Sequence, residues 1–275
     1  MTTVISLRPK RLFKVPVEGK SISPDAFANT NLSEIAKLQA WEGNRQRTLG
    51  ELFEIETNSE DKAENLSIHV HGDASKVRRI GSGMTAGEII VYKDAGFHLG
   101  EEMKGGKIHV EGNADSWLGA MMKDGTIEVK GNAGDYVGAA YRGSVKGMRG
   151  GTIIIHGKAG NELGHFMRKG LIKVDGGVGQ FAGLHMKNGT IVVMGDSEGR
   201  IGAEMVGGKI IVNGRLNEIL PTFLIDTVRP KVKVNGEELL GPFYVFAGDA
   251  AEEGNGKLYV SKPMNTHLKF YEQFL

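Results

Sequence analysis

The chain has 275 residues, and its 34 lysines and arginines nearly balance its 33 aspartates and glutamates, for a formal charge of +1. That balance argues against a protein that coats nucleic acid, and the absence of cysteine excludes disulfides, thiolate metal sites and a cysteine nucleophile. No apolar run approaches the roughly 18 residues of a membrane span, and residues 1–15 lack the apolar stretch of a signal peptide. We therefore expect a cytoplasmic protein.

Residues 1–65 form an N-terminal flank in which we expect short elements. The sequence fits a short helix over residues 33–38 and a strand over residues 49–55. Glycine is sparse here, whereas residues 66–215 contain 33 of the 41 glycines and none of the seven prolines. Dense glycine without proline indicates repeated tight turns and not a disordered segment.

Residues 66–215 repeat with a period of 19 residues. Methionines at 84, 103, 122, 148, 167, 186 and 205 follow this spacing except for one interval of 26 residues, and a glycine lies three residues after each. β-branched residues follow in an Ile-x-Val pattern, which places both side chains on one face of a strand. We expect the other face to be exposed to solvent. The isoleucine column comprises Ile68, Ile89, Ile108, Ile127, Ile153, Ile172, Ile191 and Ile210.

Such short strands cannot bury themselves alone, but stacked strands about 4.8 Å apart would place isoleucine on isoleucine and valine on valine. Leucine is too scarce for a leucine-rich repeat, and a period of 19 breaks the phase of a hexapeptide helix. We therefore predict an all-β protein, a right-handed parallel β-helix of about eight rungs. The seven extra residues fall within 139–147, and we expect them to form a projecting contact loop.

Residues 216–275 form a C-terminal flank, and both flanks are expected to cap the open ends of the β-helix. Val232–Leu239 resembles a hairpin with an Asn235–Gly236 turn, and Gly241–Phe246 fits a further strand.

A search for chemistry-bearing motifs finds no metalloprotease, serine hydrolase or phosphate-loop pattern. His69 and His109 lie two repeats apart, too far for a shared zinc ion, while His165 and His185 fall on adjacent repeats without a carboxylate in the same column. The residues therefore indicate a rigid scaffold with no metal site and no catalytic residues.

Three segments carry a resemblance to a known family. Arg79–Val91, Gly134–Gly151 and the N-terminal flank around Trp41–Phe53 are similar to the C subunit of formylmethanofuran dehydrogenase. The glycine pattern is also similar to the C-terminal domain of the glutamate synthase large subunit. The flank and the insertion at 139–147 favour the formylmethanofuran dehydrogenase family, and the match covers roughly residues 15–260.

The resemblance implies one of two complexes. In methanogens the complex reduces carbon dioxide onto methanofuran with a molybdenum or tungsten subunit. In aerobic bacteria a formyltransferase/hydrolase complex moves a formyl group from tetrahydromethanopterin to a methanofuran-type carrier and hydrolyses it to formate. The Asn-Gly pairs at 188, 213 and 235 and the absence of cysteine favour the bacterial complex.

The resemblance further implies that this chain binds no cofactor and is not an enzyme on its own. Its partners would be the A, B and D subunits of the same complex, of which the first is an amidohydrolase-type, zinc-containing hydrolase and the last a formyltransferase. A free-standing enzyme such as a sugar lyase, and a spacer akin to the glutamate synthase domain, remain alternatives. Candidate residues for binding the anionic tail of the carrier, or a partner, are Arg78, Arg79, Tyr141, Arg142, Lys146 and Arg149.

Overall fold

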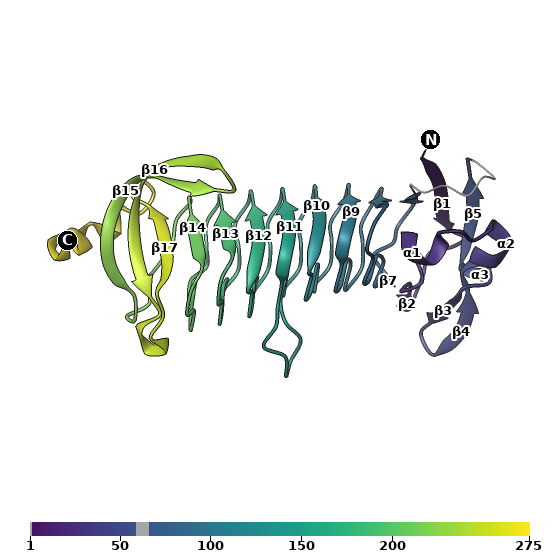
Figure 1. Ribbon diagram of the computed structural model, residues 1–275, viewed down its shortest axis with the longest axis horizontal. Coiled ribbons are helices and arrows are strands. Elements are labelled where there is room, and N and C mark those ends of the chain that lie inside the picture. The colour runs from purple at the N-terminus through teal and green to yellow at the C-terminus, as the bar shows by residue number, and fades with distance from the viewer. Residues whose placement is uncertain (1, 59–65) are drawn as a thin grey trace.

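The structure, a computed structural model, describes residues 2–58 and 66–275. Within these residues the strands form a 13-stranded sheet and a 4-stranded sheet, and the helices are short. Most strands of the larger sheet lie side by side along the long axis, with the N-terminal elements at one end and the C-terminal elements at the other (Figure 1).

The larger sheet has the strand order β15-β16-β17-β14-β13-β12-β11-β10-β9-β8-β6-β1-β5. Its strands are β1 (Thr3–Pro9), β5 (Phe53–Thr57), β6 (Leu66–Val70), β8 (Glu88–Val91), β9 (Lys104–Val110), β10 (Asp124–Val129), β11 (Arg149–Ile155), β12 (Lys169–Val174), β13 (Thr190–Val193), β14 (Lys209–Val212), β15 (Leu224–Val234), β16 (Glu237–Gly248) and β17 (Gly256–Ser261). The smaller sheet comprises β2 (Val17–Glu18), β3 (Gln39–Glu42), β4 (Arg45–Thr48) and β7 (Val77–Arg78). The helices are α1 (Pro24–Phe27), α2 (Leu32–Ile35), α3 (Leu49–Leu52) and the 3-10 helices η1 (Ala250–Glu252) and η2 (Thr266–Phe274).

The prediction of a right-handed parallel β-helix is wrong, because the strands form one large mixed sheet, mostly parallel, with antiparallel strands at both ends. Each repeat unit from β8 to β14 contributes one strand of this sheet, and the rest of the unit is turns joined by isolated bridges such as Ala95 to Ala114. The backbone of the turns explains why each unit contains only one strand. His98, Gly100 and Glu102 all have positive φ, which a regular strand cannot accommodate.

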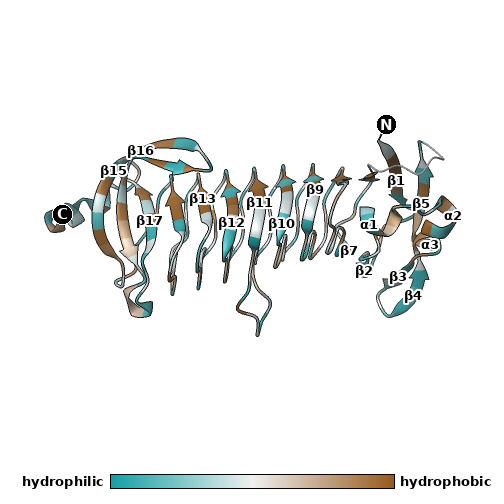
Figure 2. Ribbon diagram, viewed as in Figure 1, coloured by the Kyte–Doolittle hydropathy of each residue, from teal (hydrophilic) through white to brown (hydrophobic). Residues whose placement is uncertain are grey.

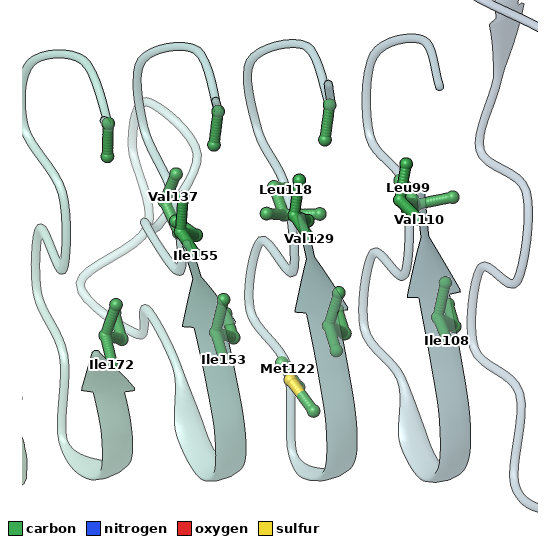
Figure 3. Close-up of a cluster of buried hydrophobic side chains, with 14 of the residues drawn as sticks. Leu99, Ile108, Val110, Leu118, Met122, Val129, Val137, Ile153, Ile155 and Ile172 are labelled. Atoms are coloured by element: carbon green, nitrogen blue, oxygen red, sulfur yellow. The ribbon is translucent and has the colours of Figure 1, made fainter. Parts of the chain in front are cut away.

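The expected alignment of the isoleucine column is confirmed. Ile68 pairs with Ile89, and isoleucine pairs with isoleucine at every further step to Ile210. The register shifts only before the isoleucines, in β10 and at the start of β11. These side chains are buried together with leucine and methionine from the turns, as Figure 3 shows for Ile108, Leu118 and Met122. Each isoleucine from Ile89 to Ile191 therefore packs against an isoleucine of the strand before and one of the strand after.

Close packing explains the glycines of the turns. Gly119 has φ +59°, and a Cβ atom there would lie 2.6 Å from the Cδ1 atom of Ile153. Glycine at this position therefore allows both the left-handed turn and the contact with the next isoleucine.

The N-terminal flank departs from expectation at residues 49–55. The short helix near residue 33 is confirmed as α2, but the predicted strand begins only at Phe53 and is preceded by helix α3. A capping box starts α3, since the Thr48 hydroxyl accepts a hydrogen bond from the Glu51 N–H and the Glu51 carboxylate accepts one from the Thr48 N–H. Hydrogen bonds from the backbone and the side chain of Thr48 to the Glu51 carboxylate lower the pKa of Glu51.

The C-terminal hairpin is confirmed, with β15 and β16 joined at Asn235 and Gly236, which both have positive φ. Its position was not expected. Val232 and Phe243 pack on Val192 and Ile211, so the outer face of the sheet is covered at this end and is not uniformly wet. Figure 2 shows hydrophobic residues on β13 and β14 and polar residues at the tip of the hairpin.

Candidate functional site

The insertion at residues 139–147 forms a loop that projects from the row of strands just before β11 (Figure 1). Tyr141 anchors its first half. The Tyr141 hydroxyl donates a hydrogen bond of 2.6 Å to Glu101 Oε1 and lies 2.7 Å from His98 Nδ1. Because the hydroxyl proton goes to Glu101, its oxygen accepts from His98, which requires the proton on Nδ1.

The protonation states around Tyr141 follow from burial. Glu101 is 5% exposed. Desolvation, with a further contribution from the bond to Glu101, strongly raises the pKa of Tyr141. Burial also lowers the pKa of His98. A neutral His98 and a neutral Tyr141 therefore hold the loop against the turn that follows β8.

Aromatic residues surround this anchor. The ring of Trp117 stacks on Tyr136 with centroids 4.4 Å apart and lies 4.9 Å from the ring of Tyr141. Sequence reasoning missed these residues, as it missed His98 and Glu101. The available signal was spacing, because Arg79, His98, Trp117 and Tyr136 follow one another at 19-residue intervals.

The structure brings Arg79 to the same place. Its guanidinium lies 3.3 Å from Glu101 Oε2 and 3.5 Å from Glu18 Oε1, and burial raises the pKa of Glu18. Arg78 lies over the ring of Phe97, with its Cζ atom 5.5 Å from the centroid. Both arginines are half-buried, so they belong to the base of the site and not to its outer surface.

The other candidates lie apart from this base. Arg142 and Lys146 are exposed, and neither forms an ion pair with another described residue. Val145, between them, is 49% exposed, and its carbonyl accepts a hydrogen bond from the Arg168 Nε–H. Arg149 is half-buried at the start of β11, and its Nε atom has no hydrogen-bond partner among the described residues. The projecting loop thus offers two free cations beside an exposed valine.

The histidines do not form a metal centre in the part of the chain that is described, where no group of three suitable side chains occurs. The rings of His165 and His185 stack with centroids 5.7 Å apart, and each lies 3.2 Å from a glutamate, Glu162 and Glu204 respectively. His69 instead contacts Tyr92 through a 3.1 Å hydrogen bond. Over the same described residues, the helices are all too short or too polar to span a bilayer.

No family model matches the chain. Among curated proteins, it is 52% identical to the C subunit of the tungsten-containing formylmethanofuran dehydrogenase 2 of Methanothermobacter thermautotrophicus over 266 residues, 96% of this chain and 98% of that one. It is 50% identical to the corresponding subunit of Methanococcus maripaludis over 92% of this chain and 95% of that one.

Other similarities are shorter or structural. A segment of 95 residues is 48% identical to the C subunit of the molybdenum-containing formylmethanofuran dehydrogenase 1 of Methanothermobacter marburgensis and spans 23% of that protein. Among solved structures, the formyltransferase/hydrolase complex (FhcABCD) from Methylorubrum extorquens in complex with methylofuran contains a similar chain. The TM-score is 0.80 at 30% identity, with 93% of this chain and 99% of that chain covered.

Proposed function

This chain belongs to the family of formylmethanofuran dehydrogenase C subunits, and from that premise we propose that it is the non-catalytic scaffold of a complex of this type. The observation that carries the proposal is the match over nearly the full length of two relatives at 50% identity or more. The membership predicted from the sequence is confirmed. We further propose that residues 1–65 and 216–275 cap the ends of the central segment 66–215, in a cytoplasmic complex.

The absence of a catalytic constellation among the described residues supports the scaffold role. They offer a long, regularly packed sheet and one projecting loop, and the buried carboxylate of Glu101 is already bound by Tyr141 and Arg79 of the same chain. In this proposal the reaction takes place on the A, B and D subunits, the first of them a zinc-containing hydrolase of the amidohydrolase type. The carrier, of the methanofuran type, reaches those subunits and not a catalytic centre on this chain.

Two reactions are candidates for the whole complex. Identity of 50–52% to tungsten-containing enzymes favours formylmethanofuran dehydrogenase. The similarity in structure to the chain of the formyltransferase/hydrolase complex, which covers 99% of that chain, favours the second candidate, formyl transfer from tetrahydromethanopterin followed by hydrolysis. The metal content of the purified complex separates them, because only the first requires molybdenum or tungsten.

Purification of the complex through a tag on this chain tests the scaffold role. We expect the other subunits to co-purify, the complex to act on a formylated carrier, and the isolated chain to have no activity. Turnover by the isolated chain would refute the proposal, as would a preparation that contains none of the partner proteins.

For the projecting loop we propose that Arg142 and Lys146 contact an acidic surface, either on a partner protein of the complex or on the carrier tail. Arg149, Arg78, Arg79 and Tyr141 would hold that loop and its base in position. Replacement of Arg142 and Lys146 by glutamate should reduce assembly or carrier use, and the loss should be greatest at low salt. The matched control replaces Lys93 and Lys187, also exposed, by glutamate. Equal behaviour of the two double variants would argue against a role for the loop.

A further inference from the structure

A ladder of hydrogen bonds from side chain to backbone runs along the turns that follow the strands. At one position of each unit, an aspartate or asparagine side chain accepts a hydrogen bond from the backbone N–H of the residue at the same position in the next unit. The bonds of this ladder join the N–H of Asn113 to Asp94 Oδ1 (2.7 Å), Asn132 to Asn113 Oδ1 (2.8 Å), Lys158 to Asn132 Oδ1 (2.8 Å) and Arg215 to Asp196 Oδ1 (2.7 Å).

The ladder is interrupted at Lys158 and Gly177. The lysine side chain has no acceptor atom and glycine has no side chain, so neither residue can accept a hydrogen bond from the backbone N–H of the next unit. As a consequence the N–H groups of Gly177 and Asp196 donate to no described residue. These two donors stand one unit apart, about 4.8 Å by the usual strand spacing. Gly177 and Asp196 occupy the repeat position at which the backbone N–H of Asn113, Asn132, Lys158 and Arg215 donates to a side-chain oxygen of the preceding unit.

A cavity of about 540 Å³ opens at this interruption. Its wall includes Gly177 and Asp196, and the side chains of Lys158 and Arg215 line it as well. Neither cation forms an ion pair with a described residue. Two acidic residues also line the cavity: the Asp196 carboxylate accepts the N–H of Arg215 in the following turn, and Glu198, like both cations, is exposed to solvent.

We propose that this cavity binds a ligand with two carboxylate groups, whose oxygens replace the two missing rungs of the ladder. Each N–H, Gly177 and Asp196, donates to one carboxylate, because two donors that lie one unit apart along the stack need separate acceptors. Lys158 and Arg215 can each give one carboxylate a charge-assisted contact that a neutral amide would lack. The site is separate from the projecting loop and does not depend on the function proposed above.

Titration of the isotopically labelled full chain with glutarate, acetate and glutaramide tests this site. We expect glutarate to shift the amide signals of Gly177 and Asp196 and to bind at least about tenfold more tightly than acetate, as one extra charge-assisted contact implies. Glutaramide, which is neutral, should bind more weakly than glutarate. If glutarate moves those signals no more than acetate does, the proposal is overturned.

Lys158→Asn provides a structural test, because asparagine would supply the missing acceptor to the Gly177 N–H and remove one cation. We expect glutarate affinity to fall about tenfold or more, whereas the control Lys187→Asn, also an exposed lysine, should change it less than about twofold. Arg215→Gln serves as a second variant should Lys158→Asn not fold. Unchanged affinity in both ladder-region variants would refute the site.

The same titration distinguishes two sources of the carboxylates. A short acidic peptide that binds at least about tenfold more tightly than glutarate would assign the site to an acidic protein segment. The reverse order would assign it to a free dicarboxylate, and either order supports the site.

Discussion

The parallel strands β6 to β14 and the C-terminal hairpin β15–β16 bury their apolar side chains in different ways. In the parallel strands, each isoleucine contacts isoleucines of the neighbouring units, so one local pattern repeats along the sheet. In the hairpin, Val232 and Phe243 pack on Val192 and Ile211, which lie on the outer face of the parallel strands β13 and β14. The packing of the parallel strands can be predicted from the regular spacing of isoleucines in the sequence. The packing of the hairpin depends on tertiary contacts that this spacing does not predict.

The largest expected effect lies in the centre of the parallel strands. Ile153 is fully buried, and Ile153→Ala should lower the free energy of unfolding by about 2–5 kcal/mol through lost burial and an unfilled cavity. Denaturant unfolding measures this effect. The control is Ile154→Ala on the opposite, half-buried face, which we expect to cost less than half as much. Equal costs would mean that the two faces of β11 are equally buried, contrary to the structure.

A similar loss is expected where the C-terminal segment meets the last parallel strands. Asn265 is fully buried, its Oδ1 atom accepts from the Leu216 N–H, and its Nδ2 atom donates to the carbonyls of Gly214 and Ser261. Asn265→Ala removes these three buried hydrogen bonds and should cost about 2–4 kcal/mol. Hydrogen exchange should show the loss first in β17 and η2. The exposed Asn255→Ala serves as the control.

A smaller effect is expected at the anchor of the projecting loop. Tyr141→Phe removes the hydroxyl between Glu101 and His98 and leaves a buried carboxylate without that donor, at a cost of about 1–3 kcal/mol. We expect faster proteolysis within residues 139–147 as well. Tyr136→Phe is the matched control, since the Tyr136 hydroxyl makes no hydrogen bond with the described residues and its ring stacking is kept. Loop proteolysis that is equal in both variants would show that the Tyr141 hydroxyl does not hold the loop.

The contrast between the repeated parallel strands and the C-terminal hairpin also explains how much of the fold could be predicted from the sequence. The register of the isoleucines, the position of the insertion and the Asn235–Gly236 hairpin were predictable, because each depends on residues near in sequence or at a fixed interval. The β-helix was wrong because the positive φ of residues such as His98 could not be inferred from residue types that normally avoid it.

The candidate site was less predictable than the fold. Arg142 and Lys146 could be named because they lie within the insertion, but their exposure and lack of ion pairs with the described residues required coordinates. Glu101 could not be found, because alanine occupies the equivalent positions 120 and 139 and no repeated pattern marks the glutamate. A side chain that acts through tertiary contacts, here with Tyr141 and Arg79, is not marked by any periodic pattern in the sequence.

The smallest expected effect concerns the outer face of the parallel strands. Hydrogen bonds from Lys130 and His156 lower the pKa of Glu128 to about 2. Since the folded-state pKa lies below the unfolded value, this contribution to stability is present above about pH 4.5 and is lost as the pH falls toward 2. For a partly exposed group screened by solvent, we expect about 1 kcal/mol at pH 7.

Glu128→Gln isolates this contribution, because glutamine keeps the size of the side chain and removes its titration. The variant should be less stable than the parent at pH 7, and the difference should shrink steadily as unfolding is measured at pH 5, 4 and 3. A control is Glu111→Gln, whose side chain is 49% exposed and, among the residues that the structure describes, forms an ion pair only with His109. A difference between Glu128→Gln and the parent that stays constant from pH 7 to pH 3 would show that these ion pairs do not stabilise the sheet.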